Sequence, residues 1–357
     1  MNEIQFVIYC GVGIALFFDF VNGFHDSANS VATVIGTKVL KPIYAVGIAA
    51  LANFSGPFLF GTAVAATVGK GIIQPEFSTV SVILAGLIGA IAWDLITWYF
   101  GLPSSSSHAL IGGLIGSALI AGGIKAIVFI GIQKTLIFMV VSPIVGFVIA
   151  FTLIIAMMYV FRKTSHSRVN KIFGKLQIAS STFLSLTHGS DDGQKTMGVI
   201  TALLIAAGLL HTKSFVIPIP VIIVAASAIS LGTFTGGWRI IKTMAFRLTD
   251  LKPYQGFCAE TGGGAILTSM AFFGIPVRTT HAIAGSIMGV GATRRLSAVR
   301  WGLGRRIVYA WIITIPASAA IAGFCLFIIK LITNSLRKTK RLMRLQVLDQ
   351  PTNTKSY

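Results

Sequence analysis

The sequence is poor in charge, and especially poor in acidic residues. Only 11% of its 357 residues are charged, whereas roughly 25% are charged in a typical soluble chain. Asp and Glu number 10 against 29 Lys and Arg, and 54% of the residues are hydrophobic. This balance excludes an ordinary globular enzyme. It also argues against a nucleic-acid partner, because the basic residues fill short gaps between apolar runs and do not cluster on soluble modules.

Cysteine is also scarce, and no leader segment is recognisable. The 3 cysteines lie in or beside apolar stretches and give no disulfide or metal-binding framework. The first twenty residues are apolar but lack a basic start, and Asp19 closes the run. A cleaved signal peptide is therefore not expected.

Long apolar runs, such as 80–100 and 307–329, are the dominant feature of the chain. Runs of this length span a lipid bilayer as helices. They predict an all-α polytopic protein of the cell membrane. Between them lie glycine-rich stretches at 4–39, 109–123, 178–210, 262–274 and 282–290. We expect broken helices there, because glycine permits breaks and breaks at membrane depth occur where protein or a wet cavity covers them.

The chain repeats two motifs in the same order. Residues 22–29 (NGFHDSAN) align with 188–195 (HGSDDGQK) at an offset of 166. Residues 101–109 (GLPSSSSHA) align with 274–282 (GIPVRTTHA) at an offset of 173. We therefore predict two homologous membrane repeats at 1–165 and 177–330. A basic cytoplasmic linker at 166–176 joins them, and a basic polar tail follows at 331–357.

The distribution of basic residues predicts that the two repeats have inverted topology. The gaps at 38–41, 162–175, 239–252 and 294–306 hold two, five, four and five Lys or Arg residues, and such gaps face the cytoplasm. The counterpart of 38–41, near 212–214, is poor in charge, and so is the counterpart of 239–252, near 70. Inverted repeats with broken helices are typical of secondary transporters. The tail is an exception, because the number of crossings puts it outside although it is basic.

Six acidic residues lie within apolar or glycine-rich stretches: Asp19, Asp26, Asp94, Asp191, Asp192 and Glu260. A single one could be a structural charge, but several at equivalent repeat positions indicate an ion or substrate path. Asp19, Asn22, Asp26 and Asn29 share one helical face, and Ser185, His188, Asp192 and Lys195 have the same spacing. We expect Asp26 and Asp192 to meet at one central site.

The second motif pair predicts two helix starts in re-entrant hairpins. Glycine and proline break the chain, and hydroxyl residues then precede a small-residue helix. A helix N-terminus offers oriented N–H donors to an anion. The candidate ligands are Ser105, Ser106, Ser107, Arg278, Thr279 and Thr280. Plain capping without a ligand is the alternative for one motif, and the matched pair argues against it.

These parts together indicate cation-coupled transport of a tetrahedral oxyanion. Hydroxyls, helix N-termini, Lys195 and Arg278 suit the anion, whereas Asp26 and Asp192 would repel it. A bound cation or protons on the carboxylates remove this repulsion. His25 and His188 can exchange protons near neutral pH, although a structural role is common for a single histidine. His108 and His281 suit orientation of the hairpin tips as well as a proton relay.

At these motifs the sequence resembles the inorganic phosphate transporter (Pit) family, in particular its bacterial low-affinity members. The family pattern is Gly-x-Asn-Asp-x-x-Asn in the first copy and His-Gly-x-Asn-Asp-Gly-Gln-Lys in the second, with Gly-Leu-Pro-x-Ser-Thr-Thr-His at the hairpins. The resemblance spans roughly residues 4–330. It implies inorganic phosphate held between the hairpin tips, with Gln194 and Lys195 nearby, and a role for Glu260. It also implies the bacterial cytoplasmic membrane, an elevator-like motion and often a homodimer.

Four positions depart from the family pattern and bear on the coupling ion. His25 and Asp191 replace motif asparagines, Asn53 replaces a glutamate of sodium-coupled members, and Arg278 replaces a serine. His25 and Asn53 favour protons over sodium. We expect coupling-ion contacts from Asn22, His25, Asp26, Asp191, Asp192 and Glu260. Sodium, if carried, would bind at Asp26 and Asp192, and a divalent metal accompanying phosphate is left open.

Three alternatives are weighed against phosphate symport by alternating access. A permease for sulfate or another tetrahedral oxyanion would use the same fold, but the motifs around Asp26, Asp192 and Gln194-Lys195 argue for phosphate. An intramembrane hydrolase using a serine of 104–107 with His108 has poor support from so short a spacing. A passive channel is disfavoured, because inverted repeats with hairpins suit alternating access. We therefore expect a transporter and no enzymatic activity. We expect no cofactor other than the co-transported ion.

Overall fold

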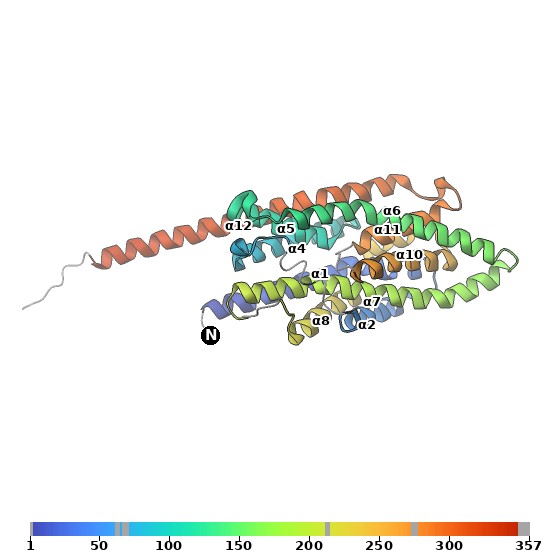
Figure 1. Cartoon of the computed structure of the whole chain (residues 1–357), viewed down its shortest axis with the longest axis horizontal. Coiled ribbons are helices and arrows are strands. Elements are labelled where there is room, and N and C mark those ends of the chain that lie inside the picture. Colours follow the sequence, from blue (N-terminus) through green and yellow to red (C-terminus); the bar gives the residue numbers. More distant parts are fainter. Residues whose placement is uncertain (1–2, 61–64, 66–70, 211–214, 273–277, 349–357) are drawn as a thin grey trace, which may run out of the picture.

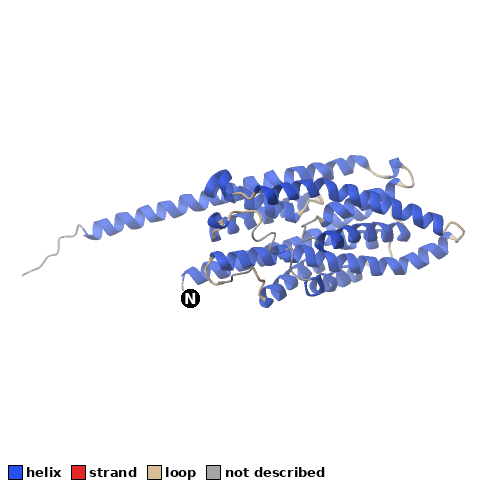
Figure 2. Ribbon diagram, in the orientation of Figure 1, coloured by secondary structure: helices blue, strands red, loops and turns tan. Residues whose placement is uncertain are grey.

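The computed structural model describes residues 3–60, 65, 71–210, 215–272 and 278–348. These residues are almost entirely helical (Figure 2), and the only β-bridge among them is an isolated antiparallel one between Ile73 and Ile127. The predicted all-α class is confirmed. The Gly274–Pro276 part of the second hairpin motif and the last nine residues of the tail lie outside the described residues.

The described residues of the first half of the chain form five main helices. They are α1 (Glu3–Gly36), α2 (Pro42–Phe60), α4 (Val80–Phe100), α5 (Ser106–Gly122) and α6 (Phe129–Val160). Short 3₁₀ turns, η1 (Pro75–Phe77) and η2 (Gly123–Ala126), precede α4 and follow α5.

The second half repeats this order. It contains α7 (His166–Ala206), α8 (Ile219–Thr235), α10 (Pro253–Phe272), α11 (Thr279–Ala292) and α12 (Trp301–Leu348). Between α8 and α10 lie the short α9 (Trp238–Lys242) and the π-helical turn η3 (Thr243–Arg247), and the 3₁₀ turn η4 (Leu296–Ala298) precedes α12. Residues 166–176, predicted as a linker, form the first turns of α7.

The helices are suited to a membrane. In the described part of the chain, six helices are long and apolar enough to cross a bilayer, or seven if α8 and the α9–η3 segment, bent by 56°, count as one span. Apolar side chains such as Ile137, Val140 and Ile144 of α6 are exposed on the outside of the bundle, as expected where lipid is the solvent. The chain is a multi-pass membrane protein.

The two halves exchange partners reciprocally. Helix α2 packs against α7 and the equivalent α8 packs against α1, while α5 packs against α12 and the equivalent α11 packs against α6. Each of these contacts between the halves therefore recurs between the counterparts of the two helices that make it. This pattern is expected of two related halves that interlock.

The helical hairpins enter the bundle from opposite ends. Figure 1 shows α4 and α5 in one half of its length and α10 and α11 in the other, with the long helices α1, α6, α7 and α12 running past both. Gly101 ends α4 in the left-handed conformation (φ 64°), and its N–H donates to the Trp98 carbonyl at 2.9 Å. Ser105 caps α5 by accepting from the His108 N–H at 3.3 Å. The predicted helix start at 105–108 is confirmed.

The start of α1 and the end of α12 lie at the same end of the bundle. Figure 1 shows both opposite the turn between α6 and α7. That turn belongs to the basic gap at 162–175, which was expected inside. This arrangement agrees with the number of crossings used for the sequence prediction, and the side of the membrane that the basic tail faces stays a prediction.

The predicted breaks within 4–39 and 178–210 are wrong, because α1 and α7 run unbroken through both motifs. The motif glycines serve close packing instead. A Cβ at Gly23 would lie 2.1 Å from the Ile229 carbonyl oxygen of α8, and a Cβ at Gly189 would lie 2.3 Å from the Asn53 Cα of α2. The breaks observed in the described chain lie at the α4–α5 tip and between α8 and α9.

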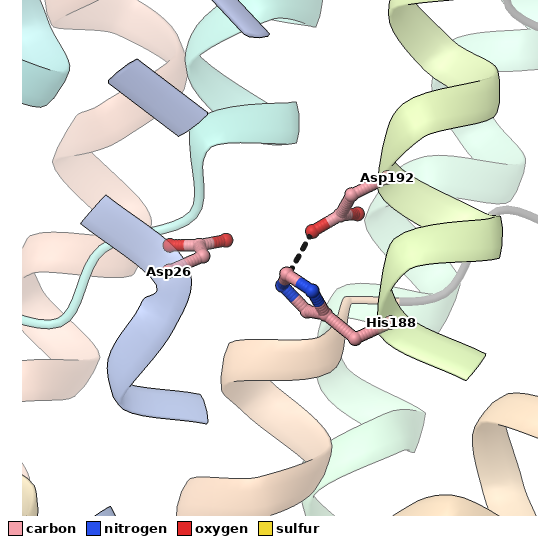
Figure 3. Close-up of side chains that lie close together, drawn as sticks. All are labelled: Asp26, His188 and Asp192. Atoms are coloured by element: carbon pink, nitrogen blue, oxygen red, sulfur yellow. Dashed lines mark ion pairs between the residues drawn. The ribbon is translucent and has the colours of Figure 1, made fainter. Parts of the chain in front are cut away.

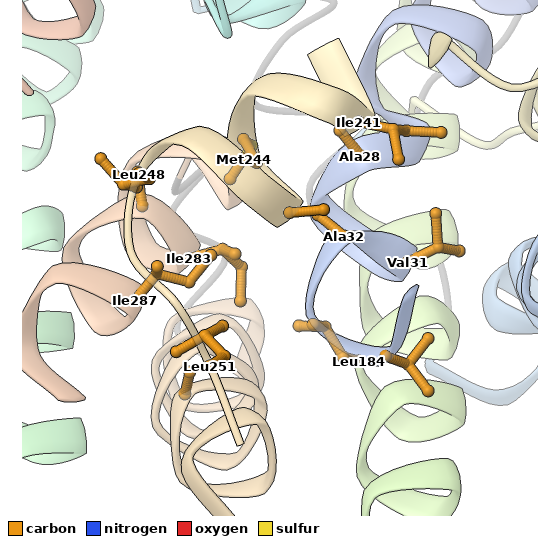
Figure 4. Packing of buried hydrophobic residues seen from close by; sticks show 14 of the residues in the cluster. Ala28, Val31, Ala32, Leu184, Ile241, Met244, Leu248, Leu251, Ile283 and Ile287 are labelled. Atoms are coloured by element: carbon orange, nitrogen blue, oxygen red, sulfur yellow. The ribbon is translucent and has the colours of Figure 1, made fainter. Parts of the chain in front are cut away.

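An apolar cluster holds the second hairpin against the rest of the bundle. Figure 4 shows Ala28 and Ala32 of α1, Met244 of η3, and Ile283 and Ile287 of α11 as members of one cluster. Small residues on α1 let these helices approach closely. The cluster fixes α11 relative to α1, which carries the first motif.

Candidate functional site

The polar faces of α1 and α7 meet in the centre of the bundle. Asp26 comes from α1 and His188 and Asp192 come from α7; all three are buried, and their ligand atoms lie within 4.8 Å of one another (Figure 3). The expected meeting of Asp26 and Asp192 is confirmed. It arises because each motif lies on the inward face of an unbroken helix.

Helix α7 carries its own counter-charge for its two carboxylates. Lys195 Nζ donates to Asp191 Oδ2 at 2.6 Å and also to Asp192 Oδ1. His188 lies one turn before Asp192 on α7, and its Nε2 is 3.1 Å from Asp192 Oδ2. Buried charges are tolerated when paired in this way, so Lys195 serves to hold Asp191 and Asp192 in place.

His25 links Asp26 to the first hairpin. Its Nδ1 lies 2.7 Å from Asp26 Oδ1, and its Nε2 lies 3.0 Å from Thr97 Oγ1 and 3.3 Å from Ser104 Oγ. Ser104 Oγ donates to Thr97 Oγ1 at 2.8 Å. This polar chain therefore runs from the α4–α5 hairpin to the central carboxylate.

The two hairpin tips meet beside the same site. The His108 and His281 rings lie 4.9 Å apart, and His281 stacks on Trp311 at 3.9 Å. Asn29 Nδ2 of α1 donates to Thr280 Oγ1 at 2.8 Å. The Asp-containing motifs and the hairpin motifs, far apart in sequence, form one site.

The hairpin tips present buried donors that have no protein partner among the described residues. They are the Ser106 and Thr279 hydroxyls and all three guanidinium nitrogens of Arg278. Arg278 is 2% exposed. Burial of a guanidinium group without hydrogen-bond acceptors destabilises the folded protein by roughly several kcal/mol. An oxyanion between the starts of α5 and α11 would supply the missing acceptors and benefit from the N-terminal N–H groups.

The carboxylate side of the site offers ligands for a small cation. Asp26, His188 and Asp192 form the one cluster in the described chain that has the spacing of metal-binding side chains. One and two turns earlier on α1, Asn22 Oδ1 and Asp19 Oδ2 are buried with no hydrogen-bond partner among the described residues, while Asp19 Oδ1 accepts from Thr196 at 2.8 Å. Oxygen ligands of this kind suit sodium. Protonation of the carboxylates is the other way to compensate for these unpartnered oxygens.

Glu260 lies in a separate polar cluster. Its Oε1 accepts from Thr33 at 2.6 Å and from Gln177 at 3.0 Å, and its Oε2 accepts from Ser180. This cluster joins α10 to α1 and α7 away from the group formed by Asp26, His188 and Asp192. The coupling role of Glu260 stays a prediction.

The remaining predicted residues are buried near the same motifs. Gln194 donates to Ser190 at 3.0 Å, Ser105 serves as the cap of α5, and Ser107 is buried in the first turn of α5. Asn53 donates to Thr233 at 2.7 Å, and its Oδ1 lies 3.4 Å from His188 Nδ1. Direct ligand contacts of these residues stay predictions.

Three residues outside the predicted site join its surroundings: Thr97, Ser104 and Asp94. Ser104 belongs to the hairpin motif and could have been included on that ground. Asp94 is buried on α4 with both carboxylate oxygens unpartnered among the described residues. The sequence marks it as a membrane acid, but its repeat counterpart Leu267 is apolar, so the repeat gave no reason to select it.

Comparison with known proteins is consistent with this site. The sequence matches the phosphate transporter family over residues 22–322. It is 51% identical to a probable low-affinity inorganic phosphate transporter of Rhizobium meliloti (strain 1021), covering 88% of this chain and 94% of the relative. It is 45% identical to the protein of the same description in Bacillus subtilis (strain 168), covering 89% and 96%.

A solved structure described as the sodium-dependent phosphate transporter has a similar fold. The TM-score is 0.84 at 25% identity, covering 91% of this chain and 99% of that one. The likeness therefore extends over most of the chain.

Proposed function

Because the chain belongs to the phosphate transporter family, we propose that it imports inorganic phosphate by symport with a cation, by alternating access, with the proton as the cation. It is a multi-pass cell-membrane transport protein and not an enzyme. The observation that carries the proposal is the juxtaposition of an unpartnered buried arginine, Arg278, with a cluster of buried carboxylates.

Phosphate binds between the two hairpin tips. Arg278, Thr279 and Thr280 act from α11 and Ser105, Ser106 and Ser107 from the start of α5. A tetrahedral oxyanion accepts several hydrogen bonds at once, which matches donors converging from two helix starts. Lys195 and Gln194 border the site from α7.

Cation coupling follows from the charge of the site. Asp26, Asp191 and Asp192 are three potential negative charges against Lys195 and Arg278, so the empty site is already anionic by one when the histidines are neutral. Carboxylate oxygens of Asp26 and Asp192 lie within 4.8 Å of each other, and two like charges at that separation repel by about 3.5 kcal/mol at an effective dielectric constant of about 20. Phosphate adds further negative charge, and a cation taken up with it offsets the repulsion.

Two features of this chain favour protons. His25 contacts Asp26 directly and connects it to hydroxyls of the first hairpin, and histidine exchanges protons near neutral pH. The other feature is Asn53, whose neutral amide contacts Thr233 and His188. Unlike a glutamate at this position, it supplies no negative charge to bind a metal cation.

Sodium is the second candidate cation. The cluster of Asp26, His188 and Asp192 has the spacing of cation ligands, and the similar solved structure is described as sodium-dependent. In this variant of the proposal, one Na⁺ binds at Asp26 and Asp192 and takes the place of the proton.

Alternating access is supported by the reciprocal packing of the two halves and by hairpins that enter from opposite ends (Figure 1). In inverted-repeat transporters, one set of elements moves against the other around a fixed site. The hairpin tips then alternate as the barrier on either side of phosphate.

The proposal is tested by phosphate uptake into proteoliposomes with independently imposed pH and sodium gradients. Acid outside should drive uphill phosphate accumulation without sodium. Accumulation driven only by sodium would select the second cation, and a failure of both gradients would overturn symport.

Substrate identity is tested in the same vesicles by competition. A 100-fold excess of sulfate should leave labelled phosphate uptake nearly unchanged, whereas arsenate should compete. Strong competition by sulfate would favour the oxyanion-permease alternative.

A further inference from the structure

Asp94 is a buried acid that the proposed function does not use. It lies in the second half of α4, is 0% exposed, and neither carboxylate oxygen has a hydrogen-bond partner among the described residues. The equivalent position on α10 is Leu267, which packs in an apolar cluster. The hairpin fold therefore does not require a carboxylate at this position. A purely structural role does not explain why the residue is an aspartate.

The position of Asp94 places it beside the transport site. Its carbonyl accepts from Thr97 Oγ1 at 3.1 Å, and Thr97 contacts His25. The charged or titratable groups whose fields reach its carboxylate are His25 and Asp26 of α1 and Asp192 of α7, and α5 contributes the Ser106 hydroxyl.

The charged side chains of α9 and α12, which also pack on α4, are engaged at other positions. Arg239 of α9 donates to the Tyr99 carbonyl at 2.6 Å. Arg306 of α12 lines a surface groove of about 450 Å³ together with Trp93 and Tyr309. Asp94 consequently has no fixed cation partner among the described residues.

An ionised carboxylate in this position is costly. Transfer of an unpaired charge to a buried membrane site is unfavourable, and the protonated acid avoids most of that penalty. A protonated carboxyl also gains a donor, which the unpartnered Ser106 Oγ can accept. When phosphate binds at the start of α5, its negative charge further favours the protonated form.

We propose that Asp94 is the binding site of one co-transported proton, separate from the cluster of Asp26, His188 and Asp192. The inference rests on the proposed function. The Asp94 carboxylate takes up one proton from the outer solution when phosphate enters and releases it to the cytoplasm when phosphate leaves. The Asp94 side chain is the unpaired, buried and titratable group that such a step needs. Its counterpart Leu267 has no group that can bind a proton.

The test uses purified full-length protein in proteoliposomes and the variant Asp94→Asn, which mimics a permanently protonated acid. Exchange of labelled for unlabelled phosphate, which needs no net proton movement, should remain within about threefold of wild type. Uphill accumulation driven by a pH gradient should fall to an inside-to-outside ratio of one. The matched control is Asp250→Asn, an exposed acid that lines a surface pocket with Arg294 and Arg295, which should leave both activities unchanged.

The opposite results overturn the inference. Retained accumulation in Asp94→Asn shows that the proton binds elsewhere, and loss of exchange together with accumulation in a folded variant shows that Asp94 serves phosphate binding. Asp94→Glu keeps a carboxylate and should retain accumulation with an altered pH profile. If the Asn variant does not fold, an unchanged profile in the Glu variant overturns the inference by itself.

Failure of the inference and failure of the proposed function are distinguishable. If wild-type protein accumulates phosphate in a pH gradient and Asp94→Asn does so equally, only the inference fails. If wild-type protein ignores the pH gradient, proton symport itself fails and Asp94 has no proton to carry.

Discussion

Replacement of Arg278 by serine tests whether this arginine binds the anion directly. Arg278 is almost fully buried, and its three guanidinium nitrogens lack acceptors among the described residues. Lys195, by contrast, is already engaged with Asp191 and Asp192. Arg278 is therefore the cation whose donors remain available for phosphate.

The expected magnitude follows from the lost hydrogen bonds. A hydrogen bond to a charged group contributes roughly 1.5–3 kcal/mol, and each 1.4 kcal/mol corresponds to about tenfold in affinity. Loss of one such bond in Arg278→Ser should raise the apparent KM for phosphate roughly 10- to 150-fold. The maximal rate should change less, because the carboxylate cluster is intact.

The assay is initial phosphate uptake in proteoliposomes as a function of phosphate concentration. Arg239→Ser is the matched control, because Arg239 donates to the Tyr99 carbonyl outside the site and its loss should leave KM within about threefold. An Arg278→Ser protein that folds and binds phosphate as wild type does would remove Arg278 from the site.

A double variant separates direct contact from charge balance. Removing Arg278 changes the formal charge of Asp26, Asp191, Asp192, Lys195 and Arg278 from −1 to −2, and adding Asp191→Asn returns it to −1. The donors stay absent, so we expect the double variant to retain at least a tenfold deficit in KM, on the order of one lost charged hydrogen bond. Full recovery would refute direct contact.

Three further predictions address the carboxylates, the lysine and the motif glycines. Asp26→Asn and Asp192→Asn should each abolish uphill accumulation while the protein stays folded in membranes; normal accumulation in either would mean that the site is misplaced. Lys195→Met should lower the thermal midpoint of the purified protein by several degrees, because removing one partner of a buried ion pair costs roughly 3–5 kcal/mol; an unchanged midpoint would contradict the pairing with Asp191 and Asp192. Gly23→Ala and Gly189→Ala should reduce the monodisperse fraction on size exclusion several-fold, since each Cβ would lie within 2.3 Å of backbone, whereas Gly47→Ala, with nothing within 4 Å, should be tolerated.

Much of the site could be predicted from the sequence because the chain is repeated. Two aligned motifs identified Asp26 and Asp192 as equivalent, and two helix starts identified Ser105 to Ser107 and Arg278 to Thr280. Low charge made each membrane acid conspicuous. These features depend on residue type and spacing, which the sequence contains directly.

The role of glycine could not be predicted from the sequence. Gly23 and Gly189 suggested helix breaks, but both lie inside continuous helices where a neighbouring backbone passes within 2.1 to 2.3 Å of the Cβ position. A glycine at a break and a glycine at a close contact look the same in a sequence. Only the tertiary arrangement of α1 with α8 and of α7 with α2 distinguishes them.

Residues without a counterpart in the other half could be recognised as membrane acids but could not be placed from the sequence. Asp94 corresponds to Leu267, and the contact of Thr97 with His25 joins two helices 72 residues apart. Glu260 was predicted at the site by resemblance, but the structure gives it partners of its own, Thr33, Gln177 and Ser180. Asymmetric features of this kind arise from packing and leave no repeated pattern.

The most direct test of the central claim is the steady-state phosphate ratio across a proteoliposome membrane at clamped potential, measured against imposed proton and sodium gradients. The account predicts that the ratio rises with the gradient of one cation, by about one decade per decade for each cation carried with phosphate. A ratio that stays well above one with neither gradient imposed, and does not change with either, would contradict it.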